Sequence, residues 1–455
     1  MEETKILEET LRDTLETLLE KKQFAAVRSL LLDTNYMDIV SVLTEFSPAE
    51  SLRIFRMLPK ETAADVFAEM DSDLQQYIIE SMTDAEVGGI MDELYMDDTV
   101  DFLEEMPANV VKRVLRNTDE TTRKIINQLL QYPDDSAGSI MTTEFVDLKK
   151  EMTAQKALEH IRKTGVDKET INNCYVLSPR RELEGVVSIR TLILSSPETT
   201  MEELMDTNVK IIRTLDDQET TAYQFRKYDL LSMPVVDTEN RLVGIITIDD
   251  IVDVIEQENT EDFHKMAAMT PSEDPYLKTS VFTLAKNRVI WLLVLMISAT
   301  FTGFIIRHYE GALSQVVALT SYIPMLMGTG GNAGAQSSTM IIRSLSLNEL
   351  DFSDLFKVVW KEFRVGFVTA FLLGIVNFLR IMILDSVSPL VALTVSLSLF
   401  CIVCLAKMVG GMLPILAEKI HLDPVIMASP IITTILDAVS LVIYFQFATH
   451  LLGIA

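Results

Sequence analysis

A single carboxylate stands inside a long apolar segment near the carboxyl end of the chain. The segment SPIITTILDAVSLVIYFQF occupies residues 429 to 447, and Asp437 lies near its middle. A charge at such a depth in a membrane is costly, so intramembrane acids usually face a water-filled cavity or an ion pathway. The rest of the sequence has to show what Asp437 faces.

A second apolar segment carries the chemistry that would accompany this acid. Residues 324 to 339 read PMLMGTGGNAGAQSST, and the glycines predict an interrupted helix with freed carbonyl oxygens. Close helix packing through small residues is the alternative interpretation. Oxygen donors without sulfur or imidazole suit a hard cation that keeps some of its waters. Gly328 and Asn332 are the predicted partners of Asp437 in ion binding.

Five apolar spans surround these motifs. They cover residues 289–306, 312–342, 365–384, 386–417 and 424–449. Basic residues cluster in the loops after the second and fourth spans, and such loops usually face the cytoplasm. They are Arg343, Lys357, Lys361, Arg364 and Lys419. This orientation places the amino-terminal half in the cytoplasm and the carboxyl terminus outside, in agreement with a chain start that lacks a signal-peptide pattern.

Charge divides the chain into two parts. Residues 1–283 hold 29 basic and 57 acidic side chains, whereas residues 284–455 hold 10 and 9. So acidic a soluble part argues against binding to nucleic acid and favours cationic partners. Cys401 and Cys404 lie in an apolar run, so we interpret them as packing residues and not as a redox pair.

The acidic part begins with a helical repeat. Between residues 46 and 106, large apolar residues recur about every twelve positions, and each is followed by a capping or turn residue. Each unit predicts one short helix that is stable only when stacked on its neighbours. Asp97 and Asp101 share one helix face. A solvated acidic face is the alternative to a cation site there.

Residues 138–256 show a duplicated pattern of strand, turn, strand and helix. YVLSPRRELEGVVSIRTLI at 175–193 aligns with PVVDTENRLVGIITIDDIV at 234–252. This resembles a pair of cystathionine-β-synthase (CBS) domains, which often bind adenine nucleotides. The second copy retains Thr247 and Asp250 of the ribose-contacting pattern, so the resemblance implies ATP as a possible regulatory ligand. A purely structural pair is the alternative.

The segment DDIVDVIEQENTEDFHKMAAM, residues 249–269, combines a helical pattern with many acids. Like charges at these spacings destabilise a helix unless cations neutralise them. The segment therefore predicts a helix whose position depends on divalent cations, with a solvated linker as the alternative.

These motifs, in this order, resemble the MgtE family of magnesium channels over nearly the whole chain. The resemblance implies a homodimer in the lipid bilayer of a bacterial inner membrane, with Asp437 of both copies in a Mg²⁺ pore at the interface. It further implies a linking helix that acts as a plug and acidic positions at which cytosolic Mg²⁺ holds the pore closed. The matching regulatory positions are Asp97, Asp101, Gly138, Asp217, Glu219, Arg226, Asp229, Asp250, Asp253, Glu258, Glu261, Asp262 and Asp423.

The expected fold is multidomain: an all-α superhelical domain, an α/β CBS pair and an α-helical membrane domain with five transmembrane helices per subunit. The expected domains are residues 1–132, 133–200 and 201–258 for the helical and two CBS domains, 259–283 for the plug helix and 284–455 for the pore. No enzymatic activity is expected, because intramembrane aspartyl proteolysis needs two carboxylates at one site, and only Asp437 lies deep in a span. Transport of Mn²⁺ or Co²⁺, or a membrane-anchored sensor without transport, are the alternative functions.

Overall fold

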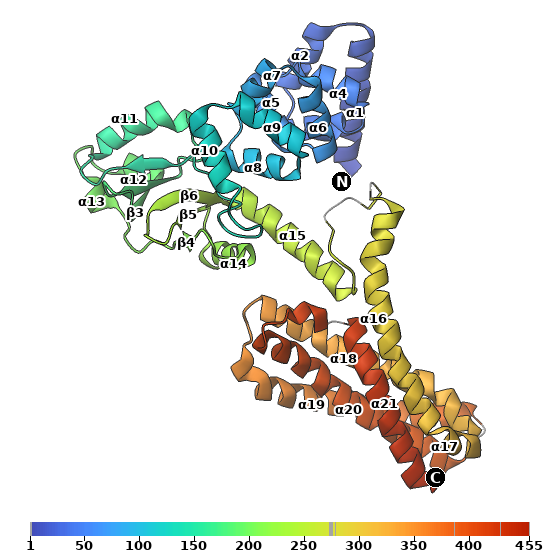
Figure 1. Ribbon diagram of the computed structural model, residues 1–455. Coiled ribbons are helices and arrows are strands. Elements are labelled where there is room, and N and C mark those ends of the chain that lie inside the picture. Colours follow the sequence, from blue (N-terminus) through green and yellow to red (C-terminus); the bar gives the residue numbers. More distant parts are fainter. Residues whose placement is uncertain (1, 273–275, 278, 386, 428, 455) are drawn as a thin grey trace. The chain divides into compact units, whose positions relative to one another are not determined.

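The computed structural model describes residues 2–272, 276–277, 279–385, 387–427 and 429–454. The chain divides into two compact units, Met1–Ile255 and Glu256–Ala455. The first unit holds helices α1 to α10 and the two small sheets, and the second holds the long helices α16 to α21 (Figure 1).

Ten short helices form the start of the first unit. They are α1 (Glu2–Glu20), α2 (Phe24–Leu32), α3 (Tyr36–Leu43), α4 (Pro48–Phe55), α5 (Lys60–Ala68), α6 (Ser72–Ser81), α7 (Asp84–Met91), α8 (Met96–Glu105), α9 (Ala108–Asn117) and α10 (Glu120–Leu129). Helices α4 to α8 confirm the predicted repeat of short helices. Capping side chains start several of them, as at Thr83, whose hydroxyl and the side chain of Glu86 form a capping box.

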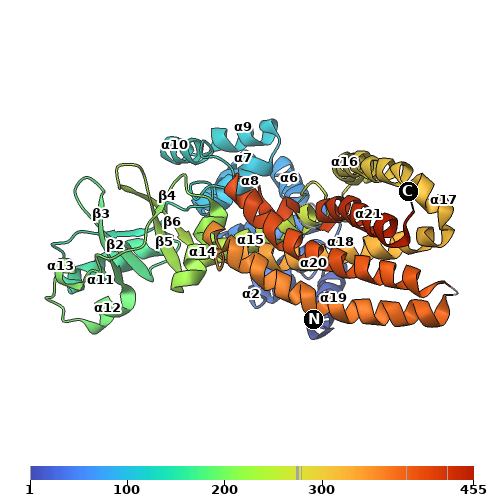
Figure 2. The same ribbon diagram turned by 90° about the horizontal axis from the view of Figure 1, so that it is seen from below.

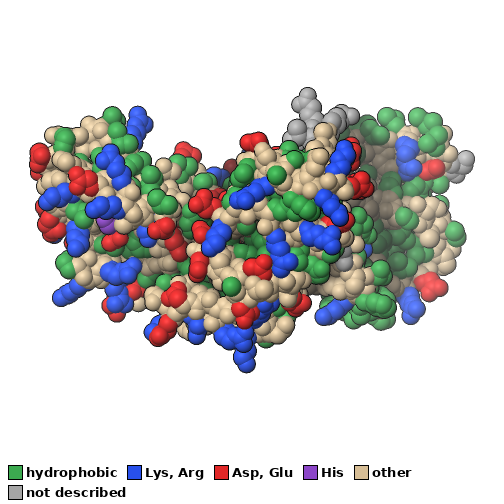
Figure 3. All heavy atoms as spheres, turned by 90° about the horizontal axis from the view of Figure 1, so that it is seen from above, with side chains coloured by type: hydrophobic (Ala, Val, Ile, Leu, Met, Phe, Trp, Pro, Cys, Tyr) green, Lys and Arg blue, Asp and Glu red, His purple; other side chains and the backbone are tan. Residues whose placement is uncertain are grey.

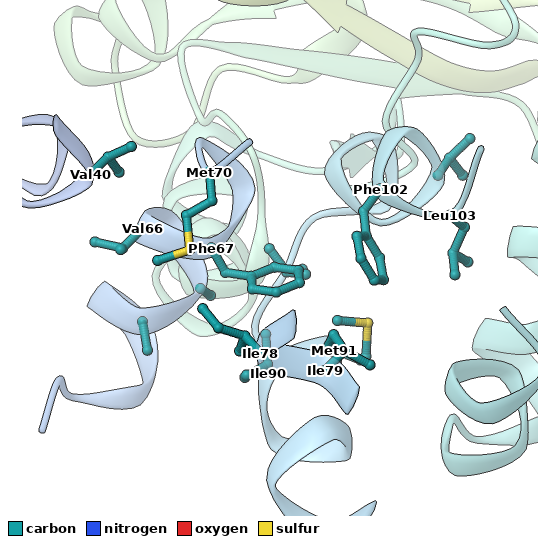
Figure 4. Packing of buried hydrophobic residues seen from close by; sticks show 14 of the residues in the cluster. Val40, Val66, Phe67, Met70, Ile78, Ile79, Ile90, Met91, Phe102 and Leu103 are labelled. Atoms are coloured by element: carbon teal, nitrogen blue, oxygen red, sulfur yellow. The ribbon is translucent and has the colours of Figure 1, made fainter. Parts of the chain in front are cut away.

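The stacked helices share one apolar interior. Phe67 of α5 and Phe102 of α8 lie with their ring centroids 5.0 Å apart in an edge-on arrangement, and Ile78 and Ile79 of α6 are fully buried beside them (Figure 4). No single helix of eight to ten residues is stable in water. The shared core therefore explains why the repeat folds, and it fixes α8 so that its acidic face points away from these aromatic rings.

Two three-stranded sheets follow, one in each CBS repeat. Their elements are β1 (Val146–Leu148), α11 (Ala154–Thr164), β2 (Asn173–Leu177), β3 (Leu183–Ser188), α12 (Ile189–Leu194), α13 (Met201–Leu204), β4 (Ile212–Arg213), α14 (Gln218–Tyr228), β5 (Ser232–Val236) and β6 (Leu242–Thr247). Each sheet pairs its first two strands in parallel and its last two antiparallel. Tyr175 and Asn173 both reach Ser232, which ties the two sheets together.

Helix α15 (Ile248–Met266) follows β6 without a break. The predicted boundary at 258/259 therefore falls inside one helix, and the helix ends at Met266, well before the predicted end of the plug at residue 283. Residues 273–275 and 278 of the predicted plug lie outside the described residues.

The second unit is a bundle of long helices. They are α16 (Val281–His308), α17 (Glu310–Gln315), α18 (Ile323–Ser346), α19 (Leu355–Leu384), α20 (Pro389–Lys419) and α21 (Ser429–Leu452). Among the described residues, four helical stretches are long and apolar enough to cross a membrane, and they contain α16, α19, α20 and α21. Helix α18 has 24 residues, about 36 Å at 1.5 Å per residue, but its composition is more polar. Helices α19 and α20 run alongside each other (Figure 2).

One prediction about α18 is wrong. The glycine-rich stretch was expected to interrupt the helix, yet α18 is continuous from Ile323 to Ser346. Its glycines allow close packing instead. A Cβ at Gly330 would lie 2.7 Å from Ser440 Oγ, and one at Gly331 would lie 2.9 Å from Thr433 Cγ2. The segment stays helical because atoms of the neighbouring helices pack directly against the glycines, in the space that a side chain would otherwise fill.

Candidate functional site

A hollow in the second unit brings the three predicted ion-binding residues together. Gly328 and Asn332 lie one helical turn apart on α18, and Asp437 lies on α21. All three line a cavity of about 390 Å³, which is also bounded by Ile323, Pro324, Met327, Gly331 and Thr433. The arrangement offers a carboxylate, an amide oxygen and water-accessible space inside a membrane-spanning bundle.

Glycine has a specific role on the hollow's side of α18. A Cβ at Gly328 would touch nothing within 4 Å, so this residue keeps space open. At Gly334, one and a half turns further on, a Cβ would collide with Leu436 of α21. Helix α18 therefore leaves a gap at Gly328, beside Asp437, and packs tightly against α21 at Gly334.

A second cluster of acids lies in the first unit, between α8 and α15. Burial and the neighbouring Asp250 of α15 raise the pKa of Asp97 well above its usual range. The same two causes, with burial the larger, raise the pKa of Asp98 to about 7 and that of Asp101 to about 7. Asp97 is only 6% exposed. Asp97 is therefore withdrawn from solvent, whereas Asp98 is half-buried and Asp101 is exposed at the edge of the same helix face.

Helix α15 supplies the facing acids. Burial raises the pKa of Asp250 to about 6, against the opposing effect of a hydrogen bond from Thr247. Asp249 and Asp253 add repulsion, and together they also raise the pKa of Glu69, which directly follows α5 and whose burial is the larger cause. The predicted residues Asp97, Asp101, Asp250 and Asp253 therefore belong to one region of negative charge. On the face seen in Figure 3, acidic and basic side chains are interspersed.

This acidic cluster fits a hard cation. Its donors are carboxylate oxygens, without thiol or imidazole groups among the residues just named, which is the ligand chemistry of Mg²⁺. Within the described ranges, no three Asp, Glu, His or Cys side chains form a group ready to hold a metal ion.

Sequence reasoning missed three members of the cluster. Asp98 is adjacent to a predicted residue, so the DD pair at 97–98 was a usable signal. Asp249 likewise precedes Asp250 in the sequence. Glu169 is different: it lies in the loop before β2, and burial together with Asp249 and Asp250 raises its pKa to about 8. Only the fold brings this loop to α15.

The predicted residues of the linking segment meet around a lysine. Lys265 Nζ lies 2.8 Å from Glu261 Oε1 and 2.8 Å from Asp423 Oδ2. These hydrogen bonds raise the pKa of Lys265 above its usual range although burial opposes them. Burial and Asp423 raise the pKa of Asp262. The structure therefore brings Glu261, Asp262 and Asp423 together. Glu258 lies one helical turn before Glu261 and Asp262 on α15.

The predicted residues on α14 do not form one site. Asp217 caps the start of the helix by accepting a hydrogen bond from Thr220 N, whereas Asp229 ends it in a left-handed conformation. About 18 Å separate the two positions at 1.5 Å per residue. Glu219 lies in the first turn, and Arg226 packs its guanidinium over Tyr223 in the last.

Gly138 lies at the same end of α14 as Asp217. Its amide donates to Thr214 O at 2.9 Å, and Ser136 and Asp217 form an isolated β-bridge. A Cβ at Gly138 would lie 2.5 Å from the Tyr132 ring, so the position requires glycine. Gly138, Asp217 and Glu219 thus share one neighbourhood, which excludes Arg226 and Asp229.

The predicted ribose-contacting pair caps a helix. Thr247 Oγ1 donates to Asp250 Oδ2 at 2.8 Å and also to Asp249, and Thr247 N donates to Asp250 Oδ2 at 3.2 Å. Ser188 forms the same kind of cap in the first repeat, where Thr191 replaces the acid. Helix capping alone accounts for these residue types.

Comparisons with known proteins agree with this domain order. The model of the MgtE intracellular N domain matches residues 34–135, the CBS domain model matches 137–198 and 201–257, and the MgtE divalent cation transporter model matches 323–447. The magnesium transporter MgtE of Thermus thermophilus is 36% identical over 98% of this chain and 99% of its own. That of Bacillus subtilis is 34% identical over 92% of this chain and 95% of its own.

Solved structures resemble the first part of the chain. The cytosolic domain of the Mg²⁺ channel MgtE in complex with ATP has a TM-score of 0.51 at 33% identity, covering 53% of this chain and 99% of that one. The soluble part of a magnesium transporter has a TM-score of 0.52 at 29% identity, covering 55% and 99%. The matching domains and the relatives aligned along nearly the whole sequence show that the chain belongs to the MgtE family of divalent cation transporters.

Proposed function

We propose that this protein is a Mg²⁺-selective channel or transporter of the bacterial inner membrane. Its helical and CBS domains are cytoplasmic and its carboxyl terminus is outside. Two copies form the functional unit, with the hollow of each copy facing a shared pore. The relatives named magnesium transporter, which align over most of the chain, support Mg²⁺ as the transported ion.

The observation that carries this proposal is the meeting of Gly328, Asn332 and Asp437 at one cavity between α18 and α21. A carboxylate beside space for water stabilises a divalent cation that retains its waters. Two copies of Asp437 would supply two negative charges for a doubly charged ion. A membrane anchor without transport has no need of such a cavity.

The test is Mg²⁺ flux into proteoliposomes that contain the full chain. We expect Asp437→Asn, which keeps the shape and removes the charge, to abolish flux while the dimer assembles as judged by size. Glu349→Gln is the control, because Glu349 is an exposed acid that follows α18 and does not line the hollow. Wild-type flux through Asp437→Asn would remove the residue from the ion pathway.

We further propose that cytosolic Mg²⁺ closes the pathway by binding the acids of the first unit and the linking helix. The raised pKa values of Asp98, Asp101 and Asp250 support this proposal, because burial and then mutual repulsion disfavour their charged forms, and a bound divalent cation offsets both. If the Mg²⁺ sites are complete only when the acidic domains and the linking helix lie close together, abundant Mg²⁺ favours that closed arrangement. Flux that is insensitive to internal Mg²⁺ in the wild type would contradict this regulation.

Mn²⁺ and Co²⁺ remain alternative substrates, since oxygen donors accept several divalent cations. Competition separates the cases. We expect excess Mg²⁺ to suppress Mn²⁺ or Co²⁺ uptake, and a stronger suppression of Mg²⁺ uptake by Mn²⁺ would assign Mn²⁺ as the substrate.

ATP is the proposed regulatory ligand of the CBS pair, as the ATP complex of a related cytosolic domain suggests. One observation bears on where its phosphates bind. A hollow of about 500 Å³ in the first repeat is lined by four basic residues, Lys149, Lys150, Lys168 and Arg181, and by two acids, Asp147 and Glu151. Thr247, in contrast, bonds to Asp250 of the acidic cluster. Calorimetric ATP titration of Lys168→Met and Thr247→Val, both in the full chain, distinguishes the two places.

A further inference from the structure

A lysine is buried inside the membrane bundle. Lys407 lies well within α20, one of the membrane-length helices, and it is 7% exposed. A charged side chain at such a position is costly unless it is paired, and it generally marks a functional element. Neither the ion pathway nor the regulatory acids described above account for it.

The lysine ammonium reaches three oxygens of α18. Lys407 Nζ lies 3.4 Å from Ala333 O, 3.2 Å from Gln336 Oε1 and 3.4 Å from Ser337 Oγ. Ser337 Oγ in turn donates to Glu362 Oε2 of α19 at 2.6 Å. The hydroxyl thus accepts from the ammonium and donates to the carboxylate, so one chain of hydrogen bonds joins α20, α18 and α19.

Glycines make this junction possible. A Cβ at Gly410 would collide with the carbonyl of Gly334, so α18 and α20 touch backbone to backbone one turn from Lys407. A Cβ at Gly411 would lie 2.9 Å from Glu362 Cγ, so the Glu362 side chain of α19 packs directly against α20. At this separation the lysine ammonium can reach the main chain of α18 as well as its side chains.

The junction and the hollow lie on neighbouring residues of α18. Asn332 lines the hollow, and the carbonyl oxygen of the next residue, Ala333, accepts from Lys407 in the junction. Successive residues of a helix point about 100° apart, so a rotation that breaks the junction also turns Asn332 and Gly328 away from Asp437. The rotation of α18 about its axis therefore decides whether the cavity has its polar lining.

We propose that Lys407 is a positioning residue for ion binding in the hollow. Through Ser337 it balances the charge of Glu362 and fixes the rotation of α18. Its ammonium also occupies oxygens that a permeant cation would otherwise bind, which confines the ion to the Asp437 side of the helix. This inference rests on the proposed role of the hollow in Mg²⁺ transport.

The test is a double-mutant cycle of Lys407→Met and Glu362→Gln in the full chain. Glu362→Gln leaves the Lys407 ammonium buried without a carboxylate, and Lys407→Met leaves the half-buried Glu362 without a cation, whereas removal of both charges leaves a neutral junction. We expect each single variant to raise the half-saturating Mg²⁺ concentration of flux at least about tenfold. The double variant should return to within about threefold of the wild type. Lys361→Met, at an exposed lysine next to Glu362, is the matched control.

Folding is monitored separately by thermal unfolding of the wild type and the four variants. A purely structural role would reduce the amount of folded protein without moving the half-saturating concentration per folded molecule, and it would overturn the proposal. So would a Lys407→Met protein that behaves as the wild type, or a double variant that fails to fold or is as impaired as the worse single. Absence of Mg²⁺ flux in the wild type would instead refute the proposed transport function itself.

Discussion

Asp98 offers the sharpest test of the repulsion in the acidic cluster. The side chain lies on α8, and its pKa is about 7 instead of 3.8, chiefly through burial and then through Asp250. At pH 8 the Asp98 carboxyl is mostly ionised, and burial and the neighbouring acids destabilise this charged form. Asp98→Asn keeps the shape and removes the charge, so we expect it to stabilise the packing of α8 against α15 when no divalent cation is present.

The magnitude follows from the pKa. A difference of about three pKa units corresponds to about 4 kcal/mol, at about 1.4 kcal/mol per unit. The titration of Asp98 is coupled to Asp97 and Asp250, so part of this free energy belongs to those residues. We therefore expect Asp98→Asn to stabilise the packing of α8 against α15 by about 2–4 kcal/mol. The assay is hydrogen exchange of α8 amides in the full chain in lipid nanodiscs, at pH 8 with a chelator. Exchange through local opening should slow about 30- to 1000-fold.

Two comparisons make the result decisive. Glu93→Gln removes one charge at an exposed position just before α8, and it should change the exchange rates little. Added Mg²⁺ should slow exchange strongly in the wild type and only weakly in Asp98→Asn, because less repulsion remains to be relieved. Unchanged or faster exchange in Asp98→Asn without Mg²⁺ would refute the reasoning.

Three further predictions concern packing, pH and the linking helix. Gly334→Val should lower the thermal unfolding temperature of the full chain by overpacking α18 against Leu436, at a cost of about 1–3 kcal/mol, whereas Gly303→Val, where a Cβ meets nothing within 4 Å, should not. The raised carboxyl pKa values of the acidic cluster mean that the folded protein binds more protons than the unfolded protein between about pH 4 and 8. The free energy of unfolding without Mg²⁺ should therefore fall as pH rises through this window. Mg²⁺ binding, measured by calorimetry, should strengthen with pH and release protons near pH 6.5. Lys265→Met should leave Asp423 and its neighbouring acids without their cation, so half-maximal inhibition of flux by internal Mg²⁺ should shift if these acids regulate the pathway, and an unshifted value would exclude them.

The sequence alone predicted the domain order and the family. The twelve-residue repeat, the duplicated CBS pattern and the apolar spans are local regularities, and local periodicity is what determines secondary structure most directly. The strongly acidic first half also predicted that cations matter there. Asp437 was recognisable because a lone acid in an apolar run is conspicuous whatever the fold around it.

The state of the glycine-rich helix was a different matter. Glycine lowers helix propensity, so GTGG favoured an interruption when considered by itself. In the folded protein Gly330, Gly331 and Gly334 pack against α20 and α21, and that tertiary contact outweighs about 1 kcal/mol of lost propensity per glycine. Sequence could not decide between the two, because the outcome depends on residues about a hundred positions away.

Only the tertiary structure brought distant charges together. It placed Glu169 beside Asp250, joined Lys265 to Asp423, and separated Asp229 from Asp217 along α14. It also linked Lys407 to Glu362 through Ser337. Electrostatic energy depends on distance and burial, which the order of residues does not contain. The chemistry of each side chain is therefore legible in the sequence, whereas its partners are a property of the fold.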